Sequence, residues 1–343
     1  MPTVPGADPA VVGPYLARVL DDPGWLGCTV EVIAGGRSNL TYTVTGASGS
    51  LVLRRPPLRA VRPTAHDVAR EHRVLSALAG TAVPVPEPVH LCTDPEVLGA
   101  PFYLMRRVDG VIARGSLPAG YADSAAERVA MTHALVDVLA ELHAVDPEAV
   151  GLAGFGRPDG YLARQLRRWQ GEWAALRDAD RRAVDALAAE LARGLPAAPS
   201  GPVVHGDYRL DNVVLDPADP GRVSAVLDWE MSTLGDPLAD LGLLLVYWQQ
   251  GRPPDGPVVT PSVTRLAGFP TGQQVVERYA ARTGRDVSAL PWYVGFGFFK
   301  LAVVVAGIVA RHRAGAMADN TDDGLTAVIE PLAESGRAAL AGS

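Results

Sequence analysis

The chain has 343 residues, more than one ordinary domain needs, so we expect two domains or two lobes. Hydrophobic residues make up 48% of the sequence and charged residues 20%, a composition that excludes a disordered chain. The net charge of −7 and the pI of about 5.5 argue against a nucleic-acid partner, because binders of nucleic acid usually carry a basic domain. The two cysteines, Cys28 and Cys92, are too few for a disulfide framework or a zinc cluster.

The first ten residues, MPTVPGADPA, have neither the basic nor the apolar segment of a signal peptide. Residues 292–310 are apolar enough to suggest a membrane span, but Lys300 near the middle would cost about 2.5–3.5 kcal/mol at a bilayer centre. We therefore expect a buried helix in this stretch, a cytoplasmic protein and no membrane partner.

The first hundred residues have the pattern of strands with one helix. Apolar, β-rich runs at 28–34, 40–46 and 51–55 predict three strands, helical spacing at 66–80 predicts a helix, and 87–94 with 101–108 predicts a hairpin-like pair. From residue 124 onward the spacing is mostly helical, except for two short apolar strands that flank a polar loop between 202 and 230.

The change in character near residues 107–110 marks the expected lobe boundary. The sequence therefore predicts an α+β, bilobal protein-kinase-like fold. A small antiparallel β-rich N-lobe, residues 1–106, would bind nucleotide, and a larger helical C-lobe, residues 107–343, would carry the catalytic loop and the acceptor-binding helices.

The motif HGDYRLDN at 205–212 indicates phosphoryl transfer most strongly. Asp207 and Asn212 are five residues apart, the spacing of the kinase catalytic loop H-R-D-x-x-x-x-N, in which the Asp receives the acceptor proton and the Asn oxygen binds Mg²⁺. Alone, such spacing more often marks a loop with a capping Asp. Here His205 stands two residues before Asp207, and we expect it to order the loop by hydrogen bonding. A second strand ends in Asp228, at the place of the metal-binding aspartate of the D-F-G motif.

Two further features would help to form the nucleotide site. The strand at 213–215, ending in Leu215, would form the floor of the pocket, and the segment GGRSN, with Gly36 and Ser38, would let backbone N–H groups approach phosphates. The glycine segment alone is a weak signal, because such segments are usually only hairpin turns.

Arg54 is the candidate for holding the phosphates. Alternation along 51–55 puts Val52 and Arg54 on one face of the strand and Arg55 on the other. Kinases place a Lys on this strand and pair it with a Glu on the next helix, but the one Lys of this chain, Lys300, lies far away in sequence. Arg54 would therefore take this role with Glu71 as its partner, and Arg55 would be nearly neutral to substitution. The alternative is an edge-strand Arg on a solvated face.

These segments together resemble a known family. HGDYRLDNVVLD, VLDWEMSTLGDPLADLG, GGRSNLTYTV, LVLRRPP, REHRVL and PFYLMRRVDG are similar to the aminoglycoside phosphotransferase (choline kinase-like) family, in the branch of the kinase domains fused to acyl-CoA dehydrogenases. The resemblance spans about residues 25–335. It implies ATP and Mg²⁺ as cofactors, a hinge near Met105–Val108, Asp207 as base, Asn212 and Asp228 as metal ligands, and Arg54 with Glu71 as the phosphate-holding pair.

The acceptor is less well defined by the sequence. Relatives of this branch phosphorylate a hydroxylated fatty acyl-CoA, and drug-modifying relatives phosphorylate aminoglycosides. Residues 160–195 hold seven Arg against five Asp and Glu, which favours an anionic hydroxylated small molecule such as a hydroxyacyl-CoA or hydroxy acid over a polycation. A catalytically weak or inactive nucleotide-binding pseudokinase stays open, because Arg54 replaces the usual Lys. The oligomeric state is not predicted.

Overall fold

The computed structural model describes residues 4–33, 39–58, 67–176, 182–197, 201–250, 262–313 and 324–342. The chain divides into two compact units. Unit 1 comprises Met1–Gly110 and Ser224–Ser232, and unit 2 comprises Val111–Val223 and Thr233–Ser343. The division expected from the sequence was continuous at residue 106, whereas Ser224–Ser232 folds with the β-rich unit.

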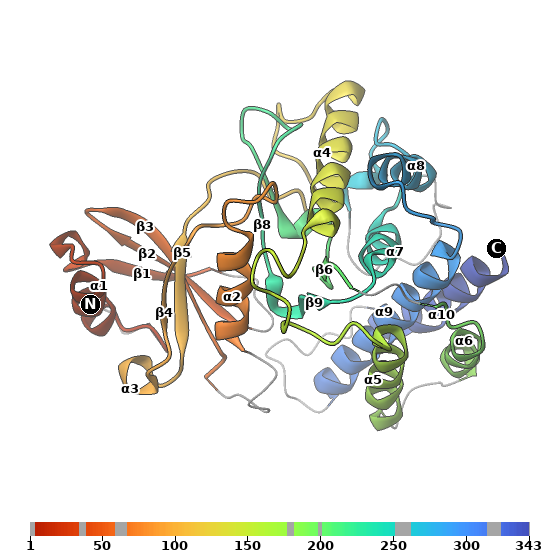
Figure 1. Cartoon of the computed structure of the whole chain (residues 1–343), viewed down its shortest axis with the longest axis horizontal. Helices are drawn as coiled ribbons and strands as arrows, with labels where there is room; N and C mark the ends of the chain where they lie inside the picture. Colours follow the sequence, from red (N-terminus) through yellow and green to blue (C-terminus); the bar gives the residue numbers. More distant parts are fainter. Residues whose placement is uncertain are drawn as a thin grey trace. The chain divides into compact units, whose positions relative to one another are not determined.

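Unit 1 is built on a five-stranded antiparallel sheet in the order β1-β2-β3-β5-β4 (Figure 1). Its strands are β1 (Thr29–Val32), β2 (Leu40–Gly46), β3 (Gly49–Arg55), β4 (Pro88–Cys92) and β5 (Phe102–Arg106), and the helix α2 (Val68–Leu78) connects β3 to β4. The predicted sequence of three strands, one helix and two strands is confirmed. The short helix α3 (Pro95–Leu98) lies between β4 and β5.

Helix α1 (Pro9–Val19), which was not predicted from the sequence, covers one face of this sheet. Gly13 and Pro14 inside the segment weaken its helical signal, because glycine and proline are the poorest helix formers. The helix forms because the Asp8 side chain caps it, accepting from Ala10 N at 2.9 Å, and because its apolar face joins the core formed by the inner face of the sheet.

Unit 2 is mainly helical. Its helices are α4 (Ala125–Ala144), α5 (Tyr161–Ala175), α6 (Arg182–Arg193), α7 (Pro237–Tyr247), α8 (Gly272–Thr283), α9 (Leu290–Arg313) and α10 (Leu325–Ala341). Short strands β6 (Val203–Val204) and β9 (Thr233–Leu234) pair antiparallel, and β7 (Val213–Leu215) follows the polar loop. Strand β8 (Val223–Val226) leads the chain from this unit into the second segment of unit 1. The α+β class predicted from the sequence, with an antiparallel β-rich part and a helical part, is confirmed.

Helix α9 forms the centre of unit 2, where it packs against α5, α6, α7 and α10. Among the described helices it is the one long and apolar enough to cross a membrane, yet most of its apolar window is buried inside the unit, as the sequence predicted. Its contact with α7 is close, since a Cβ added to Gly242 would lie 2.7 Å from the backbone of Tyr293.

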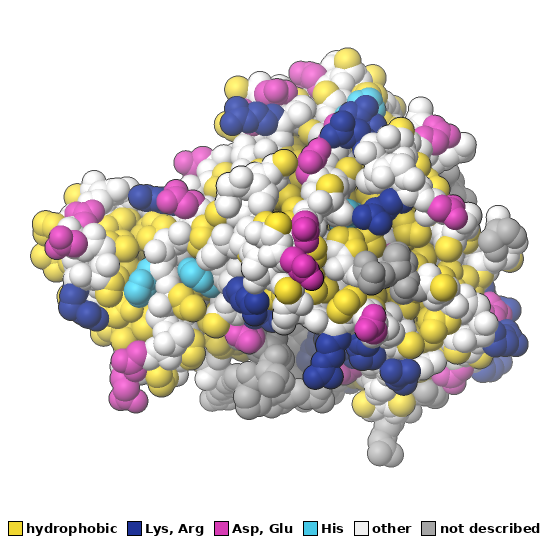
Figure 2. All heavy atoms as spheres, in the orientation of Figure 1, with side chains coloured by type: hydrophobic (Ala, Val, Ile, Leu, Met, Phe, Trp, Pro, Cys, Tyr) yellow, Lys and Arg dark blue, Asp and Glu magenta, His cyan; other side chains and the backbone are white. Residues whose placement is uncertain are grey.

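Charged side chains are spread over the face of the molecule drawn in Figure 2. On that face the basic and acidic side chains of the described residues are interspersed, without a broad basic surface. This distribution agrees with the acidic net charge of the chain.

The side chain of Arg55 is buried, which corrects the expectation that this residue is neutral to substitution. The strand alternation itself is as predicted, because Leu53 and Arg55 face α1 while Arg54 faces α2. The face toward α1 is not solvated, however. Arg55 Nη1 donates to the carbonyl oxygens of Gly6 and Leu98, both at 2.7 Å, and ties the N-terminal segment and α3 to the sheet.

We predict that Arg55→Ala lowers the free energy of unfolding by about 2–4 kcal/mol, because it removes a buried side chain and leaves two partly buried carbonyl groups without a charged donor. Urea unfolding followed by circular dichroism measures the change. The matched control is Arg106→Ala on β5. The Arg106 side chain is 54% exposed and lies 3.9 Å from Glu87, so its removal should change the free energy of unfolding by less than about 0.5 kcal/mol. Equal stabilities of wild type and Arg55→Ala would contradict the structural role of Arg55.

Candidate active site

The loop that carries Asp207 lies between β6 and β7 in unit 2. Gly206 has a φ of +84°, a left-handed conformation that favours glycine, and it turns the chain just before Asp207. The Asp207 carboxylate is 26% exposed. It accepts a hydrogen bond from Asn212 Nδ2 at 3.0 Å, and the same amide group donates to the Asp207 carbonyl oxygen at 2.9 Å. The five-residue spacing therefore brings these two predicted residues into contact.

The buried carboxylate of Asp240, on α7, fixes this loop. It accepts from the backbone N–H groups of His205 and Gly206, both at 2.7 Å, and lies 3.2 Å from His143 Nε2. Burial opposes ionisation, but the hydrogen bond and charge of His143 and the contacts with His205 leave the pKa of Asp240 below its ordinary value. A charged group in the interior thus holds the backbone of the loop that carries Asp207.

His205 is fully buried, and its Nδ1 accepts from the backbone N–H of Asp207 at 3.2 Å. The predicted ordering role of this histidine is confirmed. His143, near the end of α4, is also buried, and its Nδ1 lies 2.7 Å from the hydroxyl of Tyr279. No role was predicted for Asp240 or Tyr279 from the sequence. An Asp within the apolar run of α7 does, however, indicate a buried charge with a partner.

Unit 1 contains a second buried polar cluster, centred on Glu71 of α2. Arg54 Nε lies 2.9 Å from Glu71 Oε2, so the ion pair predicted from the sequence is present. Asn39 Nδ2 donates to Glu71 Oε1 at 2.5 Å, and the Tyr103 hydroxyl donates to Oε2 at 3.0 Å. Burial raises the pKa of Glu71, opposed by Arg54 and Tyr103, so these donors offset the cost of an enclosed carboxylate.

Asp228 follows β8 and belongs to the same unit as Arg54. It has a φ of +66°, an uncommon conformation for a residue other than glycine, at the start of the 3₁₀ helix η3 (Trp229–Met231). Arg54 Nη2 donates to Asp228 Oδ1 at 3.1 Å, while the Asp228 side chain stays 36% exposed. Burial lowers the pKa of Arg54, but Glu71, Tyr103 and Asp228 more than offset this effect and raise it overall. Arg54 therefore stays charged between two carboxylates.

The remaining predicted nucleotide residues are apolar and buried. Val52 and Met105 are direct neighbours across β3 and β5, and both are less than 9% exposed. Leu215, on β7 of unit 2, is fully buried and shares two backbone hydrogen bonds of 2.9 Å with Val111. Gly36 and Ser38 lie outside the described residues.

The predicted residues thus fall into two groups, each brought together by its own unit. In unit 1, Arg54 contacts Glu71 and Asp228. In unit 2, Asp207 contacts Asn212.

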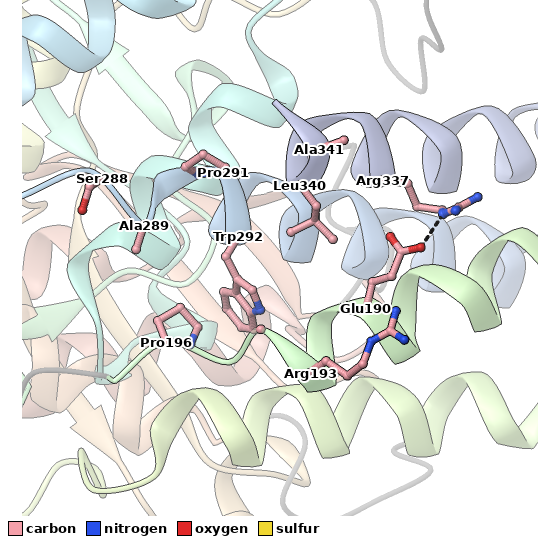
Figure 3. Close-up of a pocket in the computed structure, with 11 residues that line it drawn as sticks. Glu190, Arg193, Pro196, Ser288, Ala289, Pro291, Trp292, Arg337, Leu340 and Ala341 are labelled. Carbon is pink, nitrogen blue, oxygen red and sulfur yellow. Dashed lines mark hydrogen bonds and ion pairs between the residues drawn. The ribbon is translucent and has the colours of Figure 1, made fainter. Parts of the chain in front are cut away.

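A pocket of about 790 Å³ lies elsewhere in unit 2, among α6, the start of α9 and the end of α10 (Figure 3). Trp292 and Leu340 are among its apolar lining residues, and an ion pair of 2.9 Å joins Arg337 to Glu190 beside it. None of the residues predicted for phosphoryl transfer lines this pocket.

Comparison with known proteins agrees with this arrangement. Residues 29–282 match the model of the phosphotransferase enzyme family. Acyl-CoA dehydrogenase family member 11 of Rattus norvegicus is 36% identical over 318 residues, and family member 10 of Mus musculus is 35% identical over 305 residues. These matches cover 90% and 87% of this chain but only 40% and 28% of the relatives, so the chain spans less than half of their length.

The solved structures extend the likeness to the fold. A candidate aminoglycoside phosphotransferase from Ralstonia eutropha is 31% identical, with a TM-score of 0.80 over 98% of both chains. A thermostable mutant of the aminoglycoside phosphotransferase APH(4)-Ia, solved with ADP and hygromycin B, shares the fold at 16% identity and a TM-score of 0.63, over 97% of this chain and 99% of its own. The fold is therefore that of the aminoglycoside phosphotransferases. The chain belongs to the phosphotransferase enzyme family, and the resemblance drawn from the sequence is confirmed.

We predict that Asp240→Asn lowers the free energy of unfolding at pH 7 by about 2–4 kcal/mol, because one loop N–H loses its carboxylate acceptor. The folded pKa of Asp240 is depressed, so the contribution of its charge is complete above the ordinary Asp value of 3.8 and is lost as the pH falls through the lower folded value. The difference from wild type should therefore be constant between about pH 7 and pH 5 and narrow below about pH 4.

Urea unfolding at several pH values measures this difference. Asp109→Asn, at a side chain that is 83% exposed, is the control and should stay within about 0.5 kcal/mol of wild type throughout. A difference between wild type and Asp240→Asn that is absent at pH 7, or that grows toward pH 3, would refute the anchoring role.

Proposed function

We propose that this protein is an ATP-dependent phosphotransferase, a small-molecule kinase that acts on an alcohol group. The acceptor oxygen forms a bond to the γ-phosphorus, the bond from that phosphorus to the β–γ bridging oxygen breaks, and ADP leaves. Asp207 receives the hydroxyl proton of the acceptor. Catalysis of this kind depends on positioning and charge more than on covalent help from the protein.

The observation that carries the proposal is the geometry of the Asp207 loop. The partly exposed carboxylate of Asp207 is held by Asn212 on a backbone that Asp240 fixes from within, in a chain that belongs to the phosphotransferase enzyme family. A loop that served only as a turn would not require a buried anion to fix its backbone.

Arg54 supplies the cation for the phosphates in this proposal. The pairing with Glu71 leaves the guanidinium with further N–H donors, and a guanidinium can hold phosphate oxygens in a bidentate manner. The apolar pair Val52 and Met105 would contact the adenine, with Leu215 forming the floor of the pocket. Structural neighbours were solved with bound ADP and with bound GDP, which supports the use of a nucleotide here.

The proposed Mg²⁺ would take Asp228 and Asn212 as ligands. Both offer oxygen, the donor that Mg²⁺ prefers, and the Asn212 amide directs its nitrogen to Asp207, which leaves its oxygen on the opposite side. Among the described residues no three His, Cys, Asp or Glu side chains gather into a metal cage. This donor set fits an ion that takes its other ligands from phosphates and water, and the ion would neutralise charge on the phosphates.

The proposed acceptor is a hydroxylated small molecule with an anionic group, such as a hydroxyacyl-CoA or a hydroxy acid. Arg209 Nε lies 3.6 Å from Asp207, and Lys300 and Arg168 lie close enough to each other for their charges to interact. These cations favour an anion over a polycation. Aminoglycosides stay as the second acceptor class, since structural neighbours were solved in complex with hygromycin B and with kanamycin.

The second candidate function is a weak or inactive nucleotide-binding pseudokinase. The observation in its favour is Arg54 at the position where kinases place a lysine. From the composition we further propose a cytoplasmic location, with neither a membrane nor a nucleic acid as partner.

We predict that Asp207→Asn cuts kcat by about 10²- to 10⁴-fold while leaving ATP affinity nearly intact, because the base acts on the acceptor and not on the nucleotide. The assay is a phosphotransfer screen over hydroxyacyl-CoAs, hydroxy acids, sugars, amino alcohols and aminoglycosides, with ATP binding measured by calorimetry. Wild-type turnover by the variant on the preferred acceptor would disprove the assignment of the base. ATP binding by the wild type without turnover of any acceptor would favour the pseudokinase.

We predict that Arg54→Ala raises the KM for ATP and lowers kcat, with a loss in kcat/KM of about 10- to 150-fold, the worth of a charge-assisted hydrogen bond. Arg54→Lys should keep part of the activity, and Glu71→Gln should act as a mild form of Arg54→Ala. Steady-state kinetics with varied ATP measures each value. Arg337→Ala, which removes a partly exposed arginine paired with Glu190, replaces Arg55→Ala as the control, since Arg55 is structural. Wild-type kinetics in Arg54→Ala would exclude a role in holding the phosphates.

A further inference from the structure

Lys300 is the only lysine among the 31 basic residues of the chain. It lies in α9, a helix whose other described positions before the last turn are mostly buried and apolar. An ammonium is a compact donor, whereas a guanidinium is a planar fork of fixed geometry, so the two are not interchangeable in an enclosed site. A lysine at this one position, in a chain that otherwise uses arginine, indicates a site where the shape of the cation matters.

The Lys300 ammonium binds the catalytic loop directly. Its Nζ donates to the carbonyl oxygen of Gly206 at 2.8 Å. That oxygen belongs to the peptide group that joins Gly206 to Asp207. On the other side of the same glycine, the Gly206 N–H donates to Asp240 Oδ1 at 2.7 Å. The turn before Asp207 is therefore held from α9 by a cation and from α7 by an anion.

Trp169, on α5, supports the ammonium. Lys300 Nζ lies 5.6 Å from the centre of the indole ring, within the range of a cation–π contact. Trp169 and Trp173 lie four residues apart on α5. Trp173 does pack, at 2% exposure with its indole N–H on Asp185, whereas Trp169 presents its ring to a cation.

The charge of Lys300 also interacts with the proposed base. Burial lowers the pKa of Lys300, while Asp207 is the strongest of the neighbours that raise it, followed by Asp240. The ammonium thus lies near the Asp207 carboxylate as well as on its peptide group.

We propose that Lys300 is a positioning residue for phosphoryl transfer, whose ammonium fixes the Gly206–Asp207 peptide group and so directs the Asp207 carboxylate toward the acceptor hydroxyl. This inference rests on the proposed role of Asp207. Lys300 acts through Asp207 and not on the nucleotide, so its loss should affect kcat and leave the KM for ATP unchanged.

The test compares Lys300→Met, which keeps the length of the side chain and removes its charge, with Lys300→Arg. Arg337→Met is the control, because it removes a cation that pairs with Glu190 away from the loop. Lys300→Met should lower kcat about 10- to 100-fold, with an unchanged KM for ATP, and Lys300→Arg should recover part of this loss. In an Asp207→Asn background, Lys300→Met should cause little further loss, since residues that act as a unit are not additive.

Turnover is measured with the preferred acceptor, or with water where no acceptor is used, and thermal unfolding reports the folded fraction. The proposal would be overturned if Lys300→Met had the kcat of the wild type. It would also be overturned if the loss of kcat in the double variant equalled the product of the two single losses. If Lys300→Met keeps the kcat of the wild type while Asp207→Asn is inactive, only the proposed role of Lys300 is refuted. A wild type that phosphorylates no acceptor refutes the proposed function, and one that in addition does not hydrolyse ATP refutes the positioning role with it.

A second measurement needs neither turnover nor a Lys300 variant. Growth on ¹⁵N-lysine, with a tag that lacks lysine, gives a single side-chain ammonium signal by NMR, because the chain has one lysine. Asp207→Asn should shift this signal, and the exposed Asp109→Asn should not. A signal that is identical in wild type and Asp207→Asn would contradict the proposed coupling.

Discussion

The buried carboxylate of Asp240 is the constraint on which the Asp207 loop depends. A charge in the interior is costly unless it is paired and hydrogen-bonded, and Asp240 meets this condition by accepting from His205, Gly206 and His143. Two of these donors are backbone groups of the loop itself. Stabilising the anion and shaping the loop are therefore the same set of contacts, and α4, through His143, is tied to them as well.

Unit 1 uses a buried carboxylate in the same way. The Glu71 carboxylate pairs with Arg54 and accepts hydrogen bonds from Asn39 and Tyr103. These three residues belong to three different strands or their ends. The cost of enclosing Glu71 is offset only when these donors are in place, so the carboxylate fixes the guanidinium of Arg54. Asp228 then contacts the same guanidinium while keeping more than a third of its side chain exposed. This leaves Asp228 accessible to a further cation.

Local patterns predicted much of this arrangement. The strand alternation placed Arg54 toward Glu71, and the spacing of Asp207 and Asn212 gave a contact within one loop, because both depend on neighbours in sequence. The contacts of Asp240, Tyr279 and Lys300 join segments between 34 and 136 residues apart, and no short-range spacing encodes them. The prediction that substitution of Arg55 is nearly neutral was wrong for a related reason. Alternation predicts which face of a strand a side chain occupies but not what covers that face, and helix α1 was not predicted.

The account makes one central claim, that the chain moves the γ-phosphate of ATP to a hydroxyl group. The most direct measurement is ³¹P NMR of the wild-type protein with ATP, Mg²⁺ and the acceptor panel. The account predicts a new phosphate monoester resonance that grows in proportion to ADP and disappears when Mg²⁺ is chelated. ATP that stays intact while bound, or ADP that forms with inorganic phosphate and never with a phosphorylated acceptor, would contradict it.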